Sequence, residues 1–414
     1  MPDFQDKLEW SGEEVSSWVE DPQQVPASIF RVQDIYAISA EELGGSPPDS
    51  HFTAQEAFHL AKAAAAQRHF TLQWLLLAEA LAERETEGSL ELGELYDRIA
   101  VAASQQGNPL WASYYGRLAS QHGAEGESVE MLAELEAKLE SSDWDGTREA
   151  LPPLQNPPVA TETAIEYQKL CRNEEFKNPE LYCFLQRNSP YTLLAPAEVE
   201  HLQKSAEPKL KTAFVGFAEK GSPEYEKLRA SIFTHRDAKN MWIWDESDAI
   251  AAVLSQRVEA MTGLSVGSAE PLQLARYTKG GHYRPHYDMG QFPSNKPDAI
   301  FEEKPGGGAE FNRRIATVLF YLNQPGAGGA TVFDDLRLAV RPVARSAVFW
   351  PNIDRSGAVD LNTKHAACPV AYGLKWAANK WLRELGQMQR RPCGLSVDER
   401  WDPLPTKLWR PPAH

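Results

Sequence analysis

The stretch that organises this chain runs from Arg276 to Gly290 and reads RYTKGGHYRPHYDMG. It places His286 and Asp288 two residues apart. Residues i and i+2 of a β-strand point to the same face, so one imidazole and one carboxylate can reach a single divalent metal ion. The stretch therefore predicts a strand that carries two metal ligands, and a second strand has to supply any further histidine.

The sequence around this stretch is rich in short apolar runs separated by turns. The turns are glycine- or proline-rich and lie at 306–308, 325–329 and 352–357. Several short strands with such turns favour a β-sandwich or a jelly roll. We expect this domain to span 206–395, with a helix ending at Gly263 before the following strands: PLQLARYT, IATVLFYL, ATVFDD, LAVRPV, SAVFW, KHAACPVAY and KWAANKWLRE.

The region 51–142 shows helical periodicity instead. Thr53 and Glu56 have the spacing of a capping box, and Phe70 to Leu81 continues with apolar residues three and four apart. Paired helices with short breaks suggest a small tetratricopeptide-like array, whose concave groove suits an extended peptide. Four aromatic residues could line that groove, although aromatics at helical spacing more often belong to the core: Tyr96, Trp111, Tyr114 and Tyr115.

The remaining segments carry no recognisable chemistry. We expect residues 1–50 to be an N-terminal remnant, 143–205 a proline-rich connector and 396–414 a C-terminal tail. The formal charge of −16 disfavours a nucleic-acid partner, and no apolar run is long enough to span a membrane. The N-terminal residues lack the basic and apolar regions of a signal peptide.

The chain has 4 cysteines, and none belongs to a Cys-x-x-Cys motif, which disfavours a zinc ribbon or a thioredoxin-like site. They form two pairs that are close in sequence, Cys171 with Cys183 and Cys368 with Cys393, and this spacing suits two local disulfides. That interpretation requires an oxidising compartment, whereas no signal peptide is visible. Two alternatives stay open at this point: local disulfides, or free buried thiols.

The second histidine of the metal site comes from elimination. Of the 10 histidines, His282, His286 and His365 lie in the β region. Because His282 is separated from His286 by Pro285, we expect it to be a neighbour rather than a ligand. His286, Asp288 and His365 then give two histidines and one carboxylate, the facial triad of Fe(II) oxygenases. Without further evidence, ordinary core histidines would explain the pattern equally well.

Lys375, ten residues after His365, favours the metal site. A lysine on an otherwise apolar strand is costly to bury unpaired, but it could bind the far carboxylate of 2-oxoglutarate while the 2-oxo acid end chelates iron. Lys380 is the competing candidate, with a solvated face of the strand as the alternative. Tyr277 and Tyr321 lie on strands that could supply hydroxyl donors to this co-substrate.

Several collinear strings resemble the alpha subunits of collagen prolyl 4-hydroxylase: GGHYRPHYD, NRRIATVLFYL, GGATVF, AVFW, HAACPV, KWAANKW and GQMQRRPC. The resemblance implies an α+β multidomain fold, a helical tetratricopeptide-like domain followed by a double-stranded β-helix (jelly-roll) catalytic domain. It implies that His286, Asp288 and His365 bind Fe(II), that Lys375 binds 2-oxoglutarate, and that Tyr277 and Tyr321 assist. Tyr283 is expected to touch the substrate and Trp381 to pack near the metal. The resemblance also implies the disulfides Cys171–Cys183 and Cys368–Cys393.

The implied reaction is 4-hydroxylation of peptidyl proline in collagen-like X-Pro-Gly sequences. It consumes O2 and converts 2-oxoglutarate to succinate and CO2, with dependence on L-ascorbate. The implied partner is protein disulfide isomerase, as the beta subunit of an alpha2-beta2 tetramer in the endoplasmic reticulum lumen. Between Ala195 and Ala206 the chain is shorter than the family, which motivates the alternative of a non-catalytic peptide-binding subunit. A related oxygenase acting on another side chain would share all of the metal chemistry.

Overall fold

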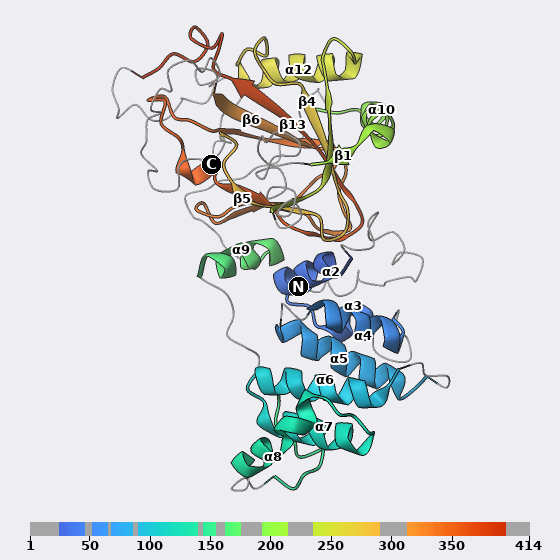
Figure 1. Cartoon of the computed structure of the whole chain (residues 1–414). Helices are drawn as coiled ribbons and strands as arrows, with labels where there is room; N and C mark the ends of the chain where they lie inside the picture. The colour runs from blue at the N-terminus through green and yellow to red at the C-terminus, as the bar shows by residue number, and fades with distance from the viewer. Residues whose placement is uncertain are drawn as a thin grey trace, which may run out of the picture. The chain divides into compact units, whose positions relative to one another are not determined.

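The computed structural model describes nine stretches of the chain: 25–45, 52–64, 68–85, 90–139, 144–154, 162–174, 193–213, 235–289 and 313–394. The chain divides into two compact units, Met1–Ile165 and Glu166–His414, called here the helical unit and the β unit (Figure 1). This division, between residues 165 and 166, falls inside the predicted connector 143–205. It does not test the predicted limits of the individual domains, which stay predictions. Among the described residues, no helix is long and apolar enough to cross a membrane.

The helical unit is built from consecutive helices that pack against their neighbours in sequence, as the short breaks predict. They are α2 (Val25–Tyr36), α3 (Ala40–Gly44), α4 (Ala54–Ala63), α5 (Arg68–Ala82), α6 (Leu92–Gln105), α7 (Pro109–Gln121) and α8 (Glu127–Leu139). The predicted capping box is present at the start of α4: Thr53 Oγ1 accepts from the Glu56 N–H and the Glu56 carboxylate accepts from the Thr53 N–H. Pro109 begins α7, where a missing N–H costs no helical hydrogen bond.

The aromatic residues of α6 and α7 divide between core and surface. Tyr96 and Tyr115 are buried, as the interpretation of these residues as core predicts. Trp111 and Tyr114 are partly exposed beside them. Trp111 stacks on Tyr115 with ring centroids 6.1 Å apart, and Tyr114 meets Tyr115 edge to face at 5.1 Å. The unit thus presents an aromatic face at α7 that is anchored in its core.

The β unit contains two larger antiparallel sheets. The six-stranded sheet has the order β1 (Lys211–Thr212), β3 (Lys239–Ile243), β4 (Leu272–Tyr277), β13 (Lys375–Arg383), β6 (Arg314–Tyr321), β10 (Ser346–Pro351). The five-stranded sheet has the order β2 (Arg236–Asp237), β5 (His282–His286), β11 (His365–Ala367), β8 (Thr331–Phe333), β9 (Leu338–Val340). A further pair joins β12 (Val370–Tyr372) to β7 (Ala327–Gly328). The predicted apolar strands are all present. The strand predicted to carry both His286 and Asp288 is shorter than expected: β5 ends at His286, and Asp288 lies in the turn after it.

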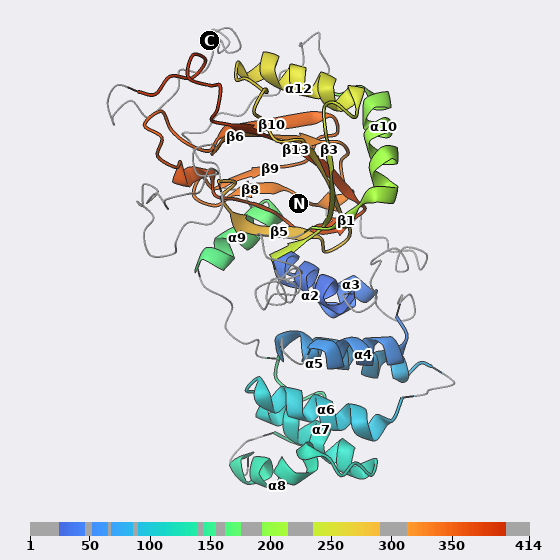
Figure 2. The ribbon, with the colours of Figure 1, turned by 45° about the horizontal axis from the view of Figure 1, so that its top comes forward.

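The two faces of the six-stranded sheet have different neighbours. Helices α10 (Pro196–Ala206) and α12 (Ala249–Thr262) cover its outer face (Figure 2). There they form an apolar core with the strands, which includes Val199, Leu202, Leu254, Val258, Leu274, Val318, Phe320, Trp376 and Leu382. The inner face contacts the five-stranded sheet: Tyr321 donates to Thr331 Oγ1 at 2.7 Å, and Trp350 meets Phe333 at 5.3 Å between ring centroids.

Hydrogen bonds hold the short segment between Ala195 and Ala206, which lies ahead of the first strand of the β unit. Pro196 starts α10 and the Glu198 carboxylate accepts from the Ala195 N–H at 2.7 Å. The same carboxylate pairs with Arg257 of α12, with both oxygens at 2.7 Å. Asp248 caps α12, and Gly263 ends it in the left-handed conformation, as predicted (φ 73°). The segment between Ala195 and Ala206 therefore supplies a helix that packs against the sheet.

The cysteine pairing differs from the prediction. Cys171, on α9 (Glu162–Arg172), is bonded to Cys368, which follows β11. The predicted pairs Cys171–Cys183 and Cys368–Cys393 are therefore wrong in this structure: each bonded sulfur has another partner. Cys393 is free and exposed, and Cys183 lies outside the described residues. Proximity in sequence was a poor guide because the fold brings α9 beside the end of β11.

Candidate metal centre

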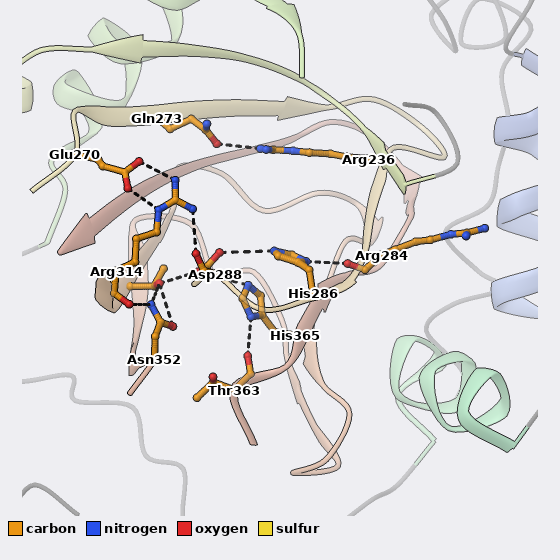
Figure 3. Close-up of polar contacts among 11 residues, drawn as sticks. Arg236, Glu270, Gln273, Arg284, His286, Asp288, Arg314, Asn352, Thr363 and His365 are labelled. Carbon is orange, nitrogen blue, oxygen red and sulfur yellow. Dashed lines mark hydrogen bonds and ion pairs between the residues drawn. The ribbon is translucent and has the colours of Figure 1, made fainter. Parts of the chain in front are cut away.

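Two neighbouring strands of the five-stranded sheet position the predicted ligands. His286 ends β5, Asp288 follows two residues later, and His365 begins β11, directly opposite His286 in the register. One ligand atom from each of these three residues lies within 4.8 Å of the other two (Figure 3). Nε2 of His286 and Nε2 of His365 each lie 3.7 Å from an Asp288 carboxylate oxygen. The structure thus brings the three predicted ligands together.

Backbone carbonyls orient both imidazole rings. Nδ1 of His286 lies 2.7 Å from the Arg284 carbonyl oxygen, and Nδ1 of His365 lies 2.8 Å from the Thr363 carbonyl oxygen (Figure 3). A carbonyl accepts only from a protonated nitrogen, so this contact places the proton on Nδ1 and leaves the Nε2 lone pair free. Histidines that bind metals are held in this way by a second hydrogen bond. Both free nitrogens point toward the Asp288 carboxylate.

Hydrogen bonds from the six-stranded sheet fix the carboxylate. Thr317 donates from Oγ1 to Asp288 Oδ2 at 2.6 Å, and Asn352 donates to Thr317 Oγ1 at 3.0 Å. Arg314 donates to the Asp288 carbonyl oxygen at 3.2 Å and is itself held by Glu270. None of these four supporting residues was predicted, because their roles depend on which strands are neighbours.

The protonation states favour metal binding. Burial raises the pKa of the Asp288 carboxyl, but His365 and His286 outweigh burial, and with Arg314 they hold this pKa below its usual range. Burial lowers the pKa of His365 to about 4, so the ring is neutral near pH 7. A metal ligand must be a neutral imidazole or an ionised carboxylate. Two imidazoles and one carboxylate on one side fit a divalent iron with open positions.

Lys375 lies on the inner face of the sheet without a counter-charge. Its side chain is 1 % exposed, and Nζ donates to the Gly329 carbonyl oxygen at 2.7 Å. Within the described part of the chain no carboxylate is paired with it, and burial lowers its pKa to about 7. Nζ lies 5.5 Å from the ring centroids of both Tyr277 and Tyr321. A carboxylate ligand would supply the missing charge, so this residue fits an acidic co-substrate.

The competing lysine has a different role. Lys380 is five residues from Lys375, which places it on the opposite face of β13. It is buried there and donates to the Asp245 carboxylate at 3.2 and 3.3 Å. The predicted alternative of a solvated face is therefore wrong: Lys380 forms a structural ion pair, and Lys375 faces the interior.

The other predicted residues lie around the ligands. Tyr283 stacks on His286 with centroids 3.6 Å apart and is covered by the Arg236 guanidinium at 4.7 Å. Trp381 is buried, and the Arg314 guanidinium lies 3.9 Å from its ring. Trp381 stands opposite Thr317 in the register, so it is one strand from the residue that holds Asp288. His282 is buried on β5 but is not part of the ligand cluster.

Residues 272–383 match the family model of the 2OG-Fe(II) oxygenase superfamily. The prolyl 4-hydroxylase subunit alpha-2 of Caenorhabditis elegans is 33 % identical over 92 % of this chain and 74 % of its own length. The prolyl 4-hydroxylase subunit alpha-1 of Rattus norvegicus is 33 % identical over 91 % of this chain and 76 % of its own length. The chain belongs to the prolyl 4-hydroxylase alpha-subunit family.

The family gives the centre its cofactors. The chain is an Fe(II)- and 2-oxoglutarate-dependent dioxygenase that uses O2, and ascorbate dependence is typical of the family. Among solved structures, a viral collagen prolyl hydroxylase from Paramecium Bursaria Chlorella virus-1 in complex with 2OG is 21 % identical, with a TM-score of 0.35. The matched region covers 47 % of this chain and 93 % of the viral chain.

Proposed function

We propose that this chain is the catalytic alpha subunit of a procollagen-proline 4-dioxygenase, which converts peptidyl proline in X-Pro-Gly sequences to 4-hydroxyproline. His286, Asp288 and His365 would hold the iron, and Lys375 would hold the far carboxylate of 2-oxoglutarate. The observation that carries the proposal is that this ligand cluster occurs together with a buried lysine, for which the described residues provide no counter-charge. Together they provide the two anchor points that a metal-chelating dicarboxylate needs.

When bound, the iron supplies the oxygen chemistry, and the protein's residues supply position and shelter. The carbonyl groups of Thr363 and Arg284 hold the imidazole rings, and Thr317 holds the carboxylate, so these three residues would present their ligand atoms to the iron in a fixed arrangement. Tyr277 and Tyr321 flank Lys375 and are expected to assist the co-substrate. The inner face excludes water with a buried cluster of Leu319, Tyr321, Phe333, Trp350 and Ala377.

We place the peptide substrate beside His286 and Trp381. Tyr283 is partly exposed and stacks directly on a proposed metal ligand, so its ring can contact the residue to be hydroxylated. The charge on Arg314 is balanced by Glu270, which keeps the guanidinium in place over Trp381. Tyr283 and Trp381 would thus position the target proline without taking part in proton transfer.

The finer architecture and the setting belong to the same proposal. The helical unit would be a tetratricopeptide-like domain that binds proline-rich peptide, and the β unit a double-stranded β-helix. The relatives are named as alpha subunits, which supports a beta-subunit partner; we propose protein disulfide isomerase in an alpha2-beta2 tetramer. The Cys171–Cys368 disulfide favours an oxidising compartment such as the endoplasmic reticulum lumen.

The test is a turnover assay on the chain co-expressed with protein disulfide isomerase. With Fe(II), ascorbate, 2-oxoglutarate and a Pro-Pro-Gly repeat peptide, we expect peptide-dependent succinate and one added oxygen on proline, located by mass spectrometry. His365→Ala should reduce both to background, whereas Lys380→Met, on the other face of the same sheet, should keep them. Peptide binding without succinate would instead favour the non-catalytic subunit, and oxygen on another side chain would favour a related oxygenase.

A further inference from the structure

A segment that leaves the last helix of the helical unit returns to its aromatic face. Residues 144–154 follow α8 and contain the sequence Leu151-Pro152-Pro153. The indole Nε1 of Trp111, on α7, donates to the Pro152 carbonyl oxygen at 2.8 Å. Trp111 is one of the two aromatic residues of this face that remain partly exposed. A diproline of the chain itself is therefore hydrogen-bonded to that face.

Two further contacts hold the segment in place. Arg148 donates to both carboxylate oxygens of Glu79, at 3.0 and 2.9 Å, and Tyr115 donates to the same carboxylate at 2.7 Å. Closer to α8, the Arg117 guanidinium lies 5.4 Å from the ring of Trp144. Glu79 is buried on α5, so the ion pair joins the returning segment to the core beneath the aromatic face. This anchor and the hydrogen bond from Trp111 together place the diproline.

The contact has the chemistry by which proline-rich peptides are recognised. Proline has no N–H, so a proline-rich chain binds through its carbonyl oxygens and its ring surfaces. Proteins that recognise such chains provide aromatic rings and a hydrogen-bond donor. Such a chain is extended before it binds, which keeps the entropy cost of binding low. Trp111 supplies the donor, and the partly exposed rings of Trp111 and Tyr114 both pack against the buried ring of Tyr115. Pro152 and Pro153 are exposed, so they contribute little to a buried core.

We propose that Leu151-Pro152-Pro153 is an intramolecular competitor that occupies the proline-peptide site of the helical unit at Trp111. This inference rests on the proposed function, in which the helical unit binds proline-rich peptide. An incoming peptide has to displace the segment, so its apparent affinity is lowered by the fraction of molecules in which the site is free. If the segment occupies the site in nine molecules of ten, the apparent dissociation constant is about tenfold higher than the intrinsic one. The segment would thus favour long substrates, which can also bind elsewhere on the enzyme, over short ones.

The experiment measures the affinity of the whole chain, co-expressed with its partner, for a fluorescent Pro-Pro-Gly repeat peptide by anisotropy. The test variant is Leu151→Ser/Pro152→Gly/Pro153→Ser, which keeps the Arg148–Glu79 ion pair. The matched control is Glu149→Ser/Ala150→Ser, which changes two exposed neighbours in the same segment. We expect the test variant to bind about five- to tenfold more tightly than the wild type, and the control to bind like the wild type.

Trp111→Phe separates competition from a change in folding. In the wild-type background it should change peptide binding less than it does in the test variant, because it removes the donor that the segment and the peptide both use. Combined with the test variant, it should abolish most of the gain in affinity, since segment and peptide share that donor. A free peptide with the sequence of residues 149–154 should compete with the labelled peptide on the test variant.

Two outcomes would overturn the proposal and are distinguishable. Equal, measurable affinities for the wild type and the test variant would show that the segment is only a cover for α7, and the proposed function would stand. Absence of peptide binding by every variant would overturn both the competition and the peptide role of the helical unit. The succinate assay at high peptide concentration then reports separately on the catalytic proposal.

Discussion

Each face of the six-stranded sheet buries one lysine of β13, and the two lysines differ in their partners. The outer face buries Lys380, pairs it with Asp245 and surrounds it with the aliphatic core under α10 and α12. The inner face buries Lys375 more completely and gives it one backbone carbonyl. Burying a lysine without a counter-charge costs free energy. A bound carboxylate ligand would offset that cost by supplying the missing charge. The comparison teaches that burial alone does not identify a functional lysine, whereas burial without a counter-charge does.

The largest expected effect comes from replacing each lysine by methionine. Lys375→Met should raise the dissociation constant for 2-oxoglutarate by the equivalent of about 2–5 kcal/mol, since a buried charge pair with the ligand is lost. It should leave the free energy of unfolding without ligand unchanged or higher, because an unpaired buried cation is removed. Binding is measured by anaerobic titration of the iron-loaded protein, and stability by urea unfolding.

Lys380→Met is the matched control for that experiment. It should leave 2-oxoglutarate binding unchanged and lower stability by about 1 kcal/mol, a small loss because Asp245 stays partly exposed to water. If the two variants showed the reverse pattern, the assignment of the two faces would be wrong.

The next effect concerns the support of the metal ligand from the inner face. Thr317→Val keeps the shape of the side chain but removes the hydrogen bond to Asp288 Oδ2. We expect metal affinity to fall about 10- to 100-fold, the usual cost of losing such a supporting group. Isothermal titration with Co(II) measures it, with Thr331→Val as a control that loses a hydroxyl bonded to Tyr321 instead of Asp288. Equal losses in the two variants would contradict a specific role for Thr317.

The third prediction is a pH dependence of stability that belongs to Lys375 alone. In the ligand-free fold its pKa is lowered from 10.5 to about 7, so between these values the unfolded chain binds a proton that the folded chain does not. Stability from this group therefore rises with pH from about 7 to 10.5, by at most about 1.4 kcal/mol per pH unit, and is constant outside that window. The difference between wild type and Lys375→Met, measured by urea unfolding at several pH values, isolates it. A pH-independent difference would show that the lysine is solvated or paired.

The smallest expected effect is that of Tyr321→Phe. The hydroxyl donates to Thr331 Oγ1 on the opposite sheet, and its loss should cost about 1 kcal/mol of stability. If Tyr321 also assists the co-substrate, the KM for 2-oxoglutarate should rise several-fold with kcat little changed. A change in melting temperature without any change in KM would assign the residue to packing alone.

The parts of the site that could be predicted are those carried by local periodicity. The spacing of two kept His286 and Asp288 close together, although β5 ends at His286 and Asp288 lies in the turn that follows. Lys375 stands out because its neighbours are apolar. Thr317, Asn352 and Arg314 were missed because a polar residue in a strand gains its role from the register with other strands. The same limit explains the cysteines: no spacing in the sequence reports that Cys171 meets Cys368. The strands and the helix ends were predictable because turns, capping residues and apolar runs act locally.

The disulfide between Cys171 and Cys368 has a consequence for the order of events during synthesis. It joins residues 197 positions apart, and the closed ring contains His286, Asp288 and His365. Because a ribosome makes the chain from its N-terminus, the bond cannot form until almost the whole β unit has emerged. Cys171 must therefore stay reduced or paired elsewhere while the next 197 residues are made. The disulfide can therefore form only after His286, Asp288 and His365 have all been synthesised.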